Sequence, residues 1–198
     1  ATDGHRLSLA TAAAADLGNL KLDEGVILPR KAVAELRRIL DGDQNVDLAF
    51  GRHHASIRKR DLSMLFQYVD GEFHEYERVI PRGEMHRATV KKDHFLRALQ
   101  RMSLVSADRT HGAKIDLRPG ELRLSANHPD VGEAVETLEV EYQGAEIAIG
   151  FNAVYLLDVF RVLEAADVEI ELKDGLSQGA IREAGNPNFL AIVMPMRI

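Results

Sequence analysis

The sequence predicts an α+β fold built from repeated units, each with one helix and a small antiparallel sheet. Two observations lead to this prediction. Segments with a helical spacing of apolar residues alternate with segments in which apolar and polar residues alternate one by one. The helical segments also recur about every sixty residues, near Leu36, Leu99 and Leu163. A fixed period of this kind indicates that one supersecondary unit recurs along the chain.

Three helices of about three turns are predicted at 29–40, 91–102 and 152–163. In each, apolar residues recur at i, then at i+3 or i+4, and at i+7, so that they share one face of a helix. The third segment has further apolar residues all round, which indicates a more buried helix.

Between the helices, the period of two is typical of half-buried antiparallel strands. Such strands are predicted at 114–118, 121–126, 137–142, 146–150 and 168–172. Turns are predicted at Pro119–Gly120, Gln143–Gly144, Asp174–Gly175 and Asn186–Pro187, because these residue types favour turn conformations.

The segment 68–85 mixes glycine, proline and both signs of charge, and it is the best linker candidate. We therefore place a domain boundary near residue 75, which divides the chain into 1–75 and 76–198. Residues 1–28 are expected to be the closing strands of an earlier unit whose helix precedes this chain. The chain is on this basis expected to be a fragment.

Composition narrows the function classes. The 198 residues include no cysteine, which excludes disulfides, thiolate nucleophiles and cysteine zinc sites. No apolar run approaches the roughly 20 residues of a membrane helix, and no membrane association is expected. A formal net charge of −6 argues against a nucleic-acid binder when it is taken alone.

Positive charge is concentrated in two segments, although the net charge of the chain is negative. The segments 30–40 and 91–102 each carry four basic residues and one acidic residue, so each has a net charge of +3 and the remainder has −12. The basic side chains could simply fill the solvent side of two amphipathic helices, or they could meet a polyanion without reading bases. The residues concerned are Arg30, Lys31, Arg37, Arg38, Lys91, Lys92, Arg97 and Arg101.

The sequence gives only weak evidence for catalytic residues. Asp3 and His5 are acid and base types, but Asp-Gly occurs four times in the chain and is a strong hairpin-turn signal. Ser106, Asp108 and His111 have the residue types of a triad but lack a nucleophile elbow. His53 and its neighbour point to opposite faces of a strand and cannot easily share a metal ion. No catalytic residue, metal site or cofactor is predicted, although a hydrolase remains an alternative.

Six segments carry a resemblance to a known family. They are "ATDGHRL", "VILPRKAVAEL", "YVDGEF", "ERVIP", "GAEIAIGFNAVYLLDV" and the terminal "VMPMR". Over the whole chain, these motifs resemble the bacterial DNA polymerase III subunit beta, the sliding clamp family. The resemblance implies a DNA-clamp fold of three similar domains, in which two protomers close into a ring with helices on the inner face.

The resemblance further implies a cytoplasmic, non-enzymatic processivity factor. It would encircle double-stranded DNA and tether the DNA polymerase III catalytic subunit, the clamp loader, other polymerases and repair proteins through peptides like Gln-Leu-x-Leu-Phe. This chain would hold the later part of the middle domain and the whole C-terminal domain. A linear, non-specific DNA-binding domain is a further alternative.

The residues that match the family's peptide groove come from five separate segments, and Leu176 and Ile198 are conservative replacements of apolar pocket residues. They are Thr2, Gly4, His5, Arg6, Leu7, Arg78, Val79, Asn152, Tyr155, Leu176, Val193, Met194, Pro195, Met196 and Arg197. Departures from the family pattern at His74, Thr110 and Gln178 put the peptide preference in doubt.

The resemblance also assigns a ring contact to Leu104 and Val105, with ion pairs from Glu133 and Glu136. Full-length members form a homodimer in which these residues meet the N-terminal domain of the other protomer. This chain lacks that domain, so we expect that it does not close a ring alone.

Overall fold

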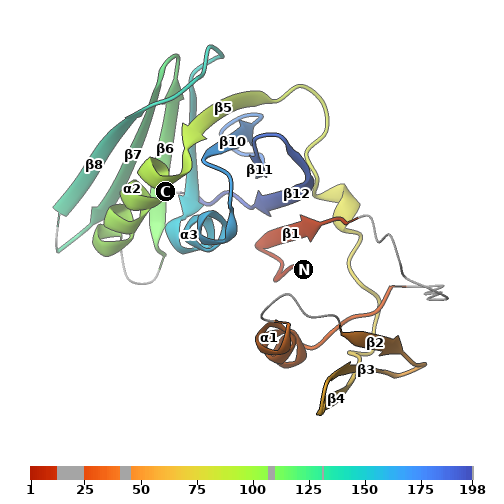
Figure 1. Cartoon of the computed structure of the whole chain (residues 1–198). Coiled ribbons are helices and arrows are strands. Elements are labelled where there is room, and N and C mark those ends of the chain that lie inside the picture. The colour runs from red at the N-terminus through yellow and green to blue at the C-terminus, as the bar shows by residue number, and fades with distance from the viewer. Residues whose placement is uncertain (13–24, 41–45, 107–109, 131, 198) are drawn as a thin grey trace. The chain divides into compact units, whose positions relative to one another are not determined.

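The computed structural model has an α+β fold, as the alternating periodicities predict (Figure 1). It describes residues 1–12, 25–40, 46–106, 110–130 and 132–197. Contacts divide the chain into a small unit, residues 13–74, and a large unit that combines residues 1–12 with 75–198.

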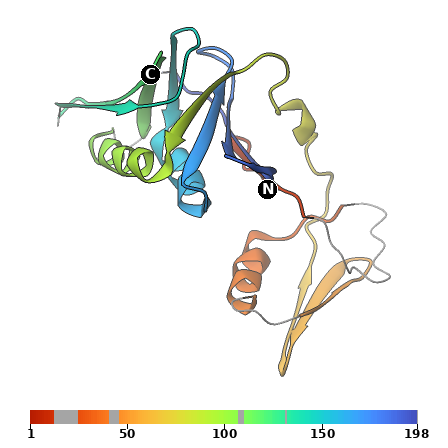
Figure 2. The same ribbon diagram turned by 45° about the horizontal axis from the view of Figure 1, so that its top comes forward.

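The small unit contains one helix and one sheet. The elements are α1 (Arg30–Ile39), β2 (Asp47–Phe50), β3 (His54–Lys59) and β4 (Leu62–Gln67), with the antiparallel strand order β2-β3-β4. Figure 2 shows α1 on one side of this sheet. Lys59 Nζ donates to the carbonyl of Ile39 at 2.6 Å and so satisfies an acceptor at the end of the helix. Ala32 is the buried residue of α1, and Val33 and Leu40 are each about half exposed.

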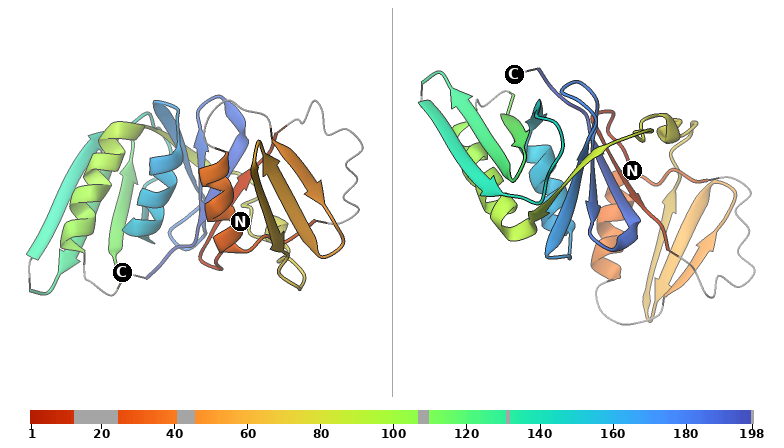
Figure 3. Two further views of the ribbon diagram at one scale, coloured as in Figure 1. Left: turned by 60° about the horizontal axis from the view of Figure 1, so that its bottom comes forward. Right: turned by 90° about the horizontal axis from the view of Figure 1, so that it is seen from above.

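The large unit contains the other two predicted helices, α2 (Lys92–Val105) and α3 (Ala153–Val162). The two helices lie side by side (Figure 3). Phe95 of α2 and Phe160 of α3 are fully buried, and their ring centroids are 4.6 Å apart. α2 packs against one sheet of the unit, and α3 also contacts the other, so a single core forms between the helices and both sheets.

Both sheets of the large unit are antiparallel. A four-stranded sheet has the order β8-β7-β6-β9, and a five-stranded sheet has the order β1-β12-β11-β10-β5. Their strands are β1 (Arg6–Ala10), β5 (His86–Lys91), β6 (Gly112–Arg118), β7 (Glu121–His128), β8 (Gly132–Glu139), β9 (Ile147–Asn152), β10 (Asp167–Leu172), β11 (Gly179–Glu183) and β12 (Asn186–Val193). A short 3-10 helix, Tyr76–Arg78, precedes β5.

The predicted repeat is present, and the strand before each helix explains how the repeats join. The order strand, helix, three strands occurs in β5-α2-β6-β7-β8 and again in β9-α3-β10-β11-β12. The leading strand of each unit pairs with the sheet of the other unit, β9 with β6 and β5 with β10. The outer edge of β12 is then paired with β1, which places the first strand of the chain beside the last.

Two local expectations need correction. The turn predicted at Asn186–Pro187 is instead at Ala184 and Gly185, where the glycine adopts φ +79°, and Asn186 opens β12. Proline is tolerated there because the first residues of a strand can dispense with a ladder donor. The strand predicted at 137–142 starts earlier, at Gly132, and ends at Glu139. By their contacts, residues 1–12 group with 75–198, because β1 pairs with β12, and the domain boundary near residue 75 stays a prediction.

Candidate functional site

The segment before β1 forms a turn at Asp3–Gly4, as the dipeptide predicts. Asp3 Oδ1 accepts hydrogen bonds from the backbone N–H groups of His5 at 3.1 Å and Arg6 at 3.0 Å. Gly4 has φ +86°, whereas Asp3 is not left-handed, so the turn is held by the Asp3 side chain. Partial burial alone would raise the pKa of Asp3, but these hydrogen bonds and the Arg6 guanidinium hold it below its ordinary value. Asp3 therefore acts as a turn former.

The side chains of β1 meet the first turns of α3. Arg6 forms ion pairs with Asp3 at 3.0 Å and with Asp158 of α3 at 2.7 Å. Its guanidinium carbon lies 4.5 Å from the centre of the Tyr155 ring, a cation–π arrangement. The His5 ring stacks against the same tyrosine, with centroids 6.2 Å apart. These residues form one partly exposed platform, defined here as His5, Arg6 and Tyr155.

Asn152 fixes the position of Tyr155. It is the N-cap of α3, and its Oδ1 accepts from the backbone N–H groups of Val154 at 2.9 Å and Tyr155 at 3.3 Å. Its amide nitrogen donates to the carbonyl of Thr110 at 3.3 Å, which ties the helix start to the loop after α2. The sequence-predicted Asn152 is thus a positioning residue for the platform.

The C-terminal segment runs beside the platform. Val193 is paired with Arg6 in the β1–β12 ladder, and the backbone N–H of Met194 donates to the carbonyl of His5 at 2.9 Å. Val193 is buried, whereas Met194 is 38% exposed. The N–H of Met196 donates to the carbonyl of Gly150 in β9 at 2.9 Å. Pro195 is half-buried in this segment and Arg197 is exposed. Ile198 lies outside the described residues.

A small apolar cluster lies on the other side of β1. Leu7, Ala180, Leu190 and Ile192 are its buried members, and Leu9, Tyr76, Val79 and Ile80 pack against them. We name it the β1 cluster. Gln178 joins the segment between β10 and β11 to the β1 cluster, because its side-chain amide donates a hydrogen bond to the carbonyl of Val79 at 2.9 Å. A sequence motif gives no signal for this contact, since the two residues are far apart along the chain.

Three predicted groove residues lie apart from the platform or serve the turn. Arg78 is largely exposed and pairs with Glu75 at 2.5 Å. Leu176 is 82% exposed in the loop between β10 and β11. Thr2 donates its hydroxyl to the carbonyl of Arg6 at 2.8 Å and therefore stabilises the turn. The platform, Met194 and the β1 cluster thus all involve β1, β12 or the residues next to them, and α3 contributes Tyr155.

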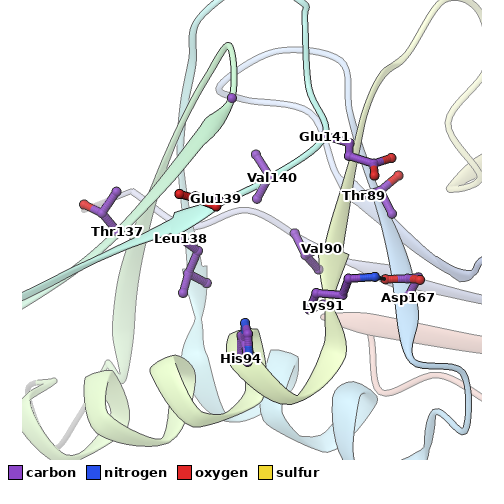
Figure 4. A pocket seen from close by; sticks show the side chains of 11 residues that line it. Thr89, Val90, Lys91, His94, Thr137, Leu138, Glu139, Val140, Glu141 and Asp167 are labelled. Atoms are coloured by element: carbon purple, nitrogen blue, oxygen red, sulfur yellow. Dashed lines mark ion pairs between the residues drawn. The ribbon is translucent and has the colours of Figure 1, made fainter.

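Among the described residues of the large unit, two surface hollows concern the candidate site and its neighbourhood. One, of about 460 Å³, adjoins the β1 cluster through Ile80 and is lined also by Arg78, Arg82, Lys173 and Gln178. The other, of about 740 Å³, lies among β5, the start of α2, the end of β8 and Asp167 (Figure 4).

The larger hollow carries mixed charge. Glu139 and Glu141 line it together with Lys91 and His94, and Lys91 pairs with Asp167 at 2.7 Å. Lys91 is the predicted site residue that lines this hollow, and its ammonium group forms an ion pair with the carboxylate of Asp167. No short sequence signal marks this hollow, because its lining comes from separate segments.

The eight predicted DNA-facing residues divide into paired and unpaired groups. Arg38 pairs with Glu35 at 3.1 Å, Lys92 donates to the carbonyl of Leu163 at 3.1 Å, and Arg101 pairs with Glu136. With Lys91, half of the set is engaged within the protein. In the part of the chain that the structure describes, Arg30, Lys31, Arg37 and Arg97 are exposed and form no ion pair.

The predicted ring-contact residues lie at the end of α2 and on β8. Leu104 is 82% exposed, Val105 is half-buried and Glu133 is exposed. Glu136 accepts both hydrogen bonds of the Arg101 guanidinium, and the bond from Arg101 lowers its pKa. β8 is an edge strand of its sheet, with one side unpaired along the ladder. The prediction assigned Arg101 and Glu136 to different surfaces, and the structure brings them together.

Within the described residues, the candidate catalytic side chains do not form the nucleophile–base hydrogen bond that a hydrolase would need. The Ser106 hydroxyl is buried and donates to the carbonyl of Ser103 at 3.2 Å, not to a histidine. Asp108 lies outside the described residues. His5 contacts Tyr155 and Arg6 lies beside it, an arrangement without a nucleophile. Across the described residues, no group of three His, Asp or Glu side chains could hold a metal ion, and no helix is long and apolar enough to span a membrane.

Comparisons with known proteins cover the whole chain. Residues 1–75 match the family model of the DNA polymerase III beta subunit central domain, and residues 77–197 match that of its C-terminal domain. The chain is 36% identical over 200 residues to the beta sliding clamp of Pseudomonas putida and 35% identical over 199 residues to that of Escherichia coli K12. Both alignments cover 100% of this chain, and 53% and 54% of the relatives.

Solved structures give the same result. The crystal structure of the DNA polymerase III subunit beta from Pseudomonas aeruginosa superposes with a TM-score of 0.94 at 36% identity, over 100% of this chain and 54% of that chain. The chain therefore spans about half the length of the relatives it matches.

Proposed function

The chain belongs to the DNA polymerase III beta subunit family, the beta sliding clamps, and from this premise we propose that it is part of a DNA replication processivity factor. In this proposal it acts without catalysis, in the cytoplasm, as half of a protomer that closes with a second copy into a ring around double-stranded DNA. The replicative polymerase, the clamp loader, other polymerases and repair proteins are held through short peptides. The family-model ranges support a domain boundary close to residue 75.

One observation carries the peptide-groove proposal. A platform of His5, Arg6 and Tyr155 lies beside the half-exposed Met194, and the β1 cluster packs on the same pair of strands. A peptide with apolar and amide side chains needs apolar surface together with a few well-positioned polar groups. The platform supplies aromatic and cationic surface, and Met194 supplies a flexible apolar side chain that adapts to several partners. Val79 packs against the β1 cluster, and Gln178 donates a hydrogen bond to its carbonyl.

Two other surfaces support the ring and its contact with DNA. Leu104 is exposed at the end of α2, and the edge of β8 has backbone groups available for pairing with another chain. The exposed Arg30, Lys31, Arg37 and Arg97 lie on helices and are suited to phosphate contacts that carry no base information. In the proposal these helices face the DNA, and the homodimer forms in the full-length protein.

The groove is tested by fluorescence anisotropy of a labelled Gln-Leu-x-Leu-Phe peptide. The titrations use this chain, an Arg6→Ala/Met194→Ala variant and a control variant, Arg123→Ala, whose exposed side chain lies on β7 in the other sheet. Saturable binding that weakens at least tenfold in the first variant and is unchanged in the control is the expected result. Equal binding by all three proteins, or no binding by the folded chain, would contradict the proposed groove.

The competing linear DNA-binding function has a separate test. A domain that binds DNA linearly holds a short duplex with an affinity that falls steeply with salt. A clamp retains DNA by closing around it, so we expect this chain to bind a short linear duplex poorly. Tight, salt-dependent binding of the duplex would favour the linear-binding alternative.

A further inference from the structure

The smaller hollow, of about 460 Å³, has a one-sided charge. Three basic residues, Arg78, Arg82 and Lys173, line it together with Ser177 and the amide of Gln178, and none of its lining residues is acidic. The rest of the chain is strongly acidic, with a net charge of −6 overall. A concave surface lined by charges of one sign concentrates the field and attracts groups of the opposite sign.

The nearest carboxylates leave most of that positive charge available. Glu75 pairs with Arg78 at 2.5 Å, which accounts for one of the three cations. Asp174 is occupied by its own loop, since Oδ1 accepts from the N–H of Leu176 at 2.8 Å and of Ser177 at 2.7 Å. Within the described residues, Arg82 and Lys173 are exposed and form no ion pair, and the charge of Lys173 makes a minor contribution to the lowered pKa of Asp174.

The hollow is continuous with the β1 cluster. Ile80 lines the hollow and also packs against Leu7 and its neighbours, and Gln178 links the two by its 2.9 Å hydrogen bond to Val79. A ligand that places apolar side chains on the cluster therefore brings its flanking residues to the cations. A hollow of this size beside an apolar surface suits one or two side chains better than the backbone of a duplex.

We propose that this hollow, through Arg82 and Lys173, binds the side-chain carboxylates of Asp or Glu residues that flank the apolar motif of a partner peptide. The inference rests on the proposed peptide groove and adds a preference for acidic flanks to it. It predicts that partners are ranked by the charge of the residues next to the motif as well as by the motif itself.

The test uses two labelled peptides with the same Gln-Leu-x-Leu-Phe core, extended at both ends by two Asp or by two Asn residues. Extending both ends makes the comparison independent of peptide direction. At low ionic strength, about 0.05 M, this chain is expected to bind the Asp peptide about three- to tenfold more tightly than the Asn peptide. An Arg82→Gln/Lys173→Gln variant is expected to lose this preference while its affinity for the Asn peptide stays within about twofold. Arg123→Gln, which removes one positive charge on the other sheet, is expected to keep the preference.

Each of the other outcomes would contradict a different part of the proposal. If the wild-type chain binds both peptides equally, the acidic preference is wrong and the groove stands. If the double variant keeps the preference, the carboxylates bind elsewhere. If neither peptide binds, the groove itself is wrong and the inference fails with it. If a short DNA duplex binds more tightly than the Asp peptide and depends on Arg82 and Lys173, the hollow binds phosphates and the peptide assignment is wrong.

Discussion

Replacing Glu171 by glutamine is expected to lower the free energy of unfolding of the large unit by about 2 kcal/mol. The Glu171 side chain is 9% exposed on β10, where Oε1 accepts from Arg87 Nη2 at 2.7 Å and Oε2 accepts from Arg182 Nε at 3.3 Å. Glutamine keeps the shape but loses the charge, and its amide group opposes one of the two donors. Both arginines reach water, with side chains 56% and 31% exposed, so the loss stays below the roughly 3–5 kcal/mol of a fully buried broken pair.

Glu169→Gln is the matched control on the same strand. Its contact to Arg87 is longer, at 3.3 Å, and its side chain is 22% exposed, so the expected loss is about 0.5 kcal/mol. Urea unfolding can be followed by circular dichroism, since the chain has no tryptophan. With a denaturant slope of about 2 kcal/mol/M, the midpoint of Glu171→Gln should fall by about 1 M. Equal midpoints for the two variants would refute the argument that burial and two charged donors make Glu171 special.

Three further predictions concern the core, one carboxylate and one exposed leucine. Phe95→Ala should cost about 3–5 kcal/mol in the same urea experiment, because the ring is fully buried against Phe160; a loss under 1 kcal/mol would contradict that packing. The side-chain hydrogen bond from Asn186 and two backbone N–H groups lower the pKa of Glu183, so its contribution is present above the ordinary pKa of 4.5 and is lost as pH falls through the lowered value. The stability difference between the wild-type chain and Glu183→Gln should therefore shrink between about pH 6 and pH 3, and a difference that grew on acidification would contradict the assignment. Leu104→Glu should change stability by no more than about 0.5 kcal/mol, because the side chain is 82% exposed, and a larger loss would show that it is packed.

The helices and the repeat could be predicted because their signals are local. Apolar spacing of 3.6 is a property of neighbouring residues, and the predicted segments agree with α1, α2 and α3 to within a few residues. Strand pairing is different. Nothing in "RLSLA" shows that it pairs with a strand ending at Val193, and this pairing moved residues 1–12 into the large unit. The exposure of Val33 and Leu40 was also unpredicted, since periodicity marks an apolar face without showing what covers it.

Motif resemblance predicted the candidate site, whereas the contacts of its residues could be described only from the fold. Asn152 was named as a groove residue and turns out to cap α3 and position Tyr155. Asp158, which anchors Arg6, was not predicted, because its carboxylate resembles any other on a helix surface. Arg101 and Glu136 were predicted separately and neutralise each other. Contacts of this kind depend on side chains far apart in sequence, and single-sequence patterns do not contain them.

The pairing of β1 with β12 has a consequence for biosynthesis. Arg6 meets Val193, so the backbone hydrogen bonds that hold the platform beside Met194 need the last strand to be present. At a translation rate of roughly 5–20 residues per second, β1 waits about 10 to 40 s on the ribosome for its partner strand. During that interval β1 offers an unpaired edge that chaperones or neighbouring nascent chains can bind. The proposed peptide groove is therefore incomplete on a growing chain until synthesis has passed residue 194.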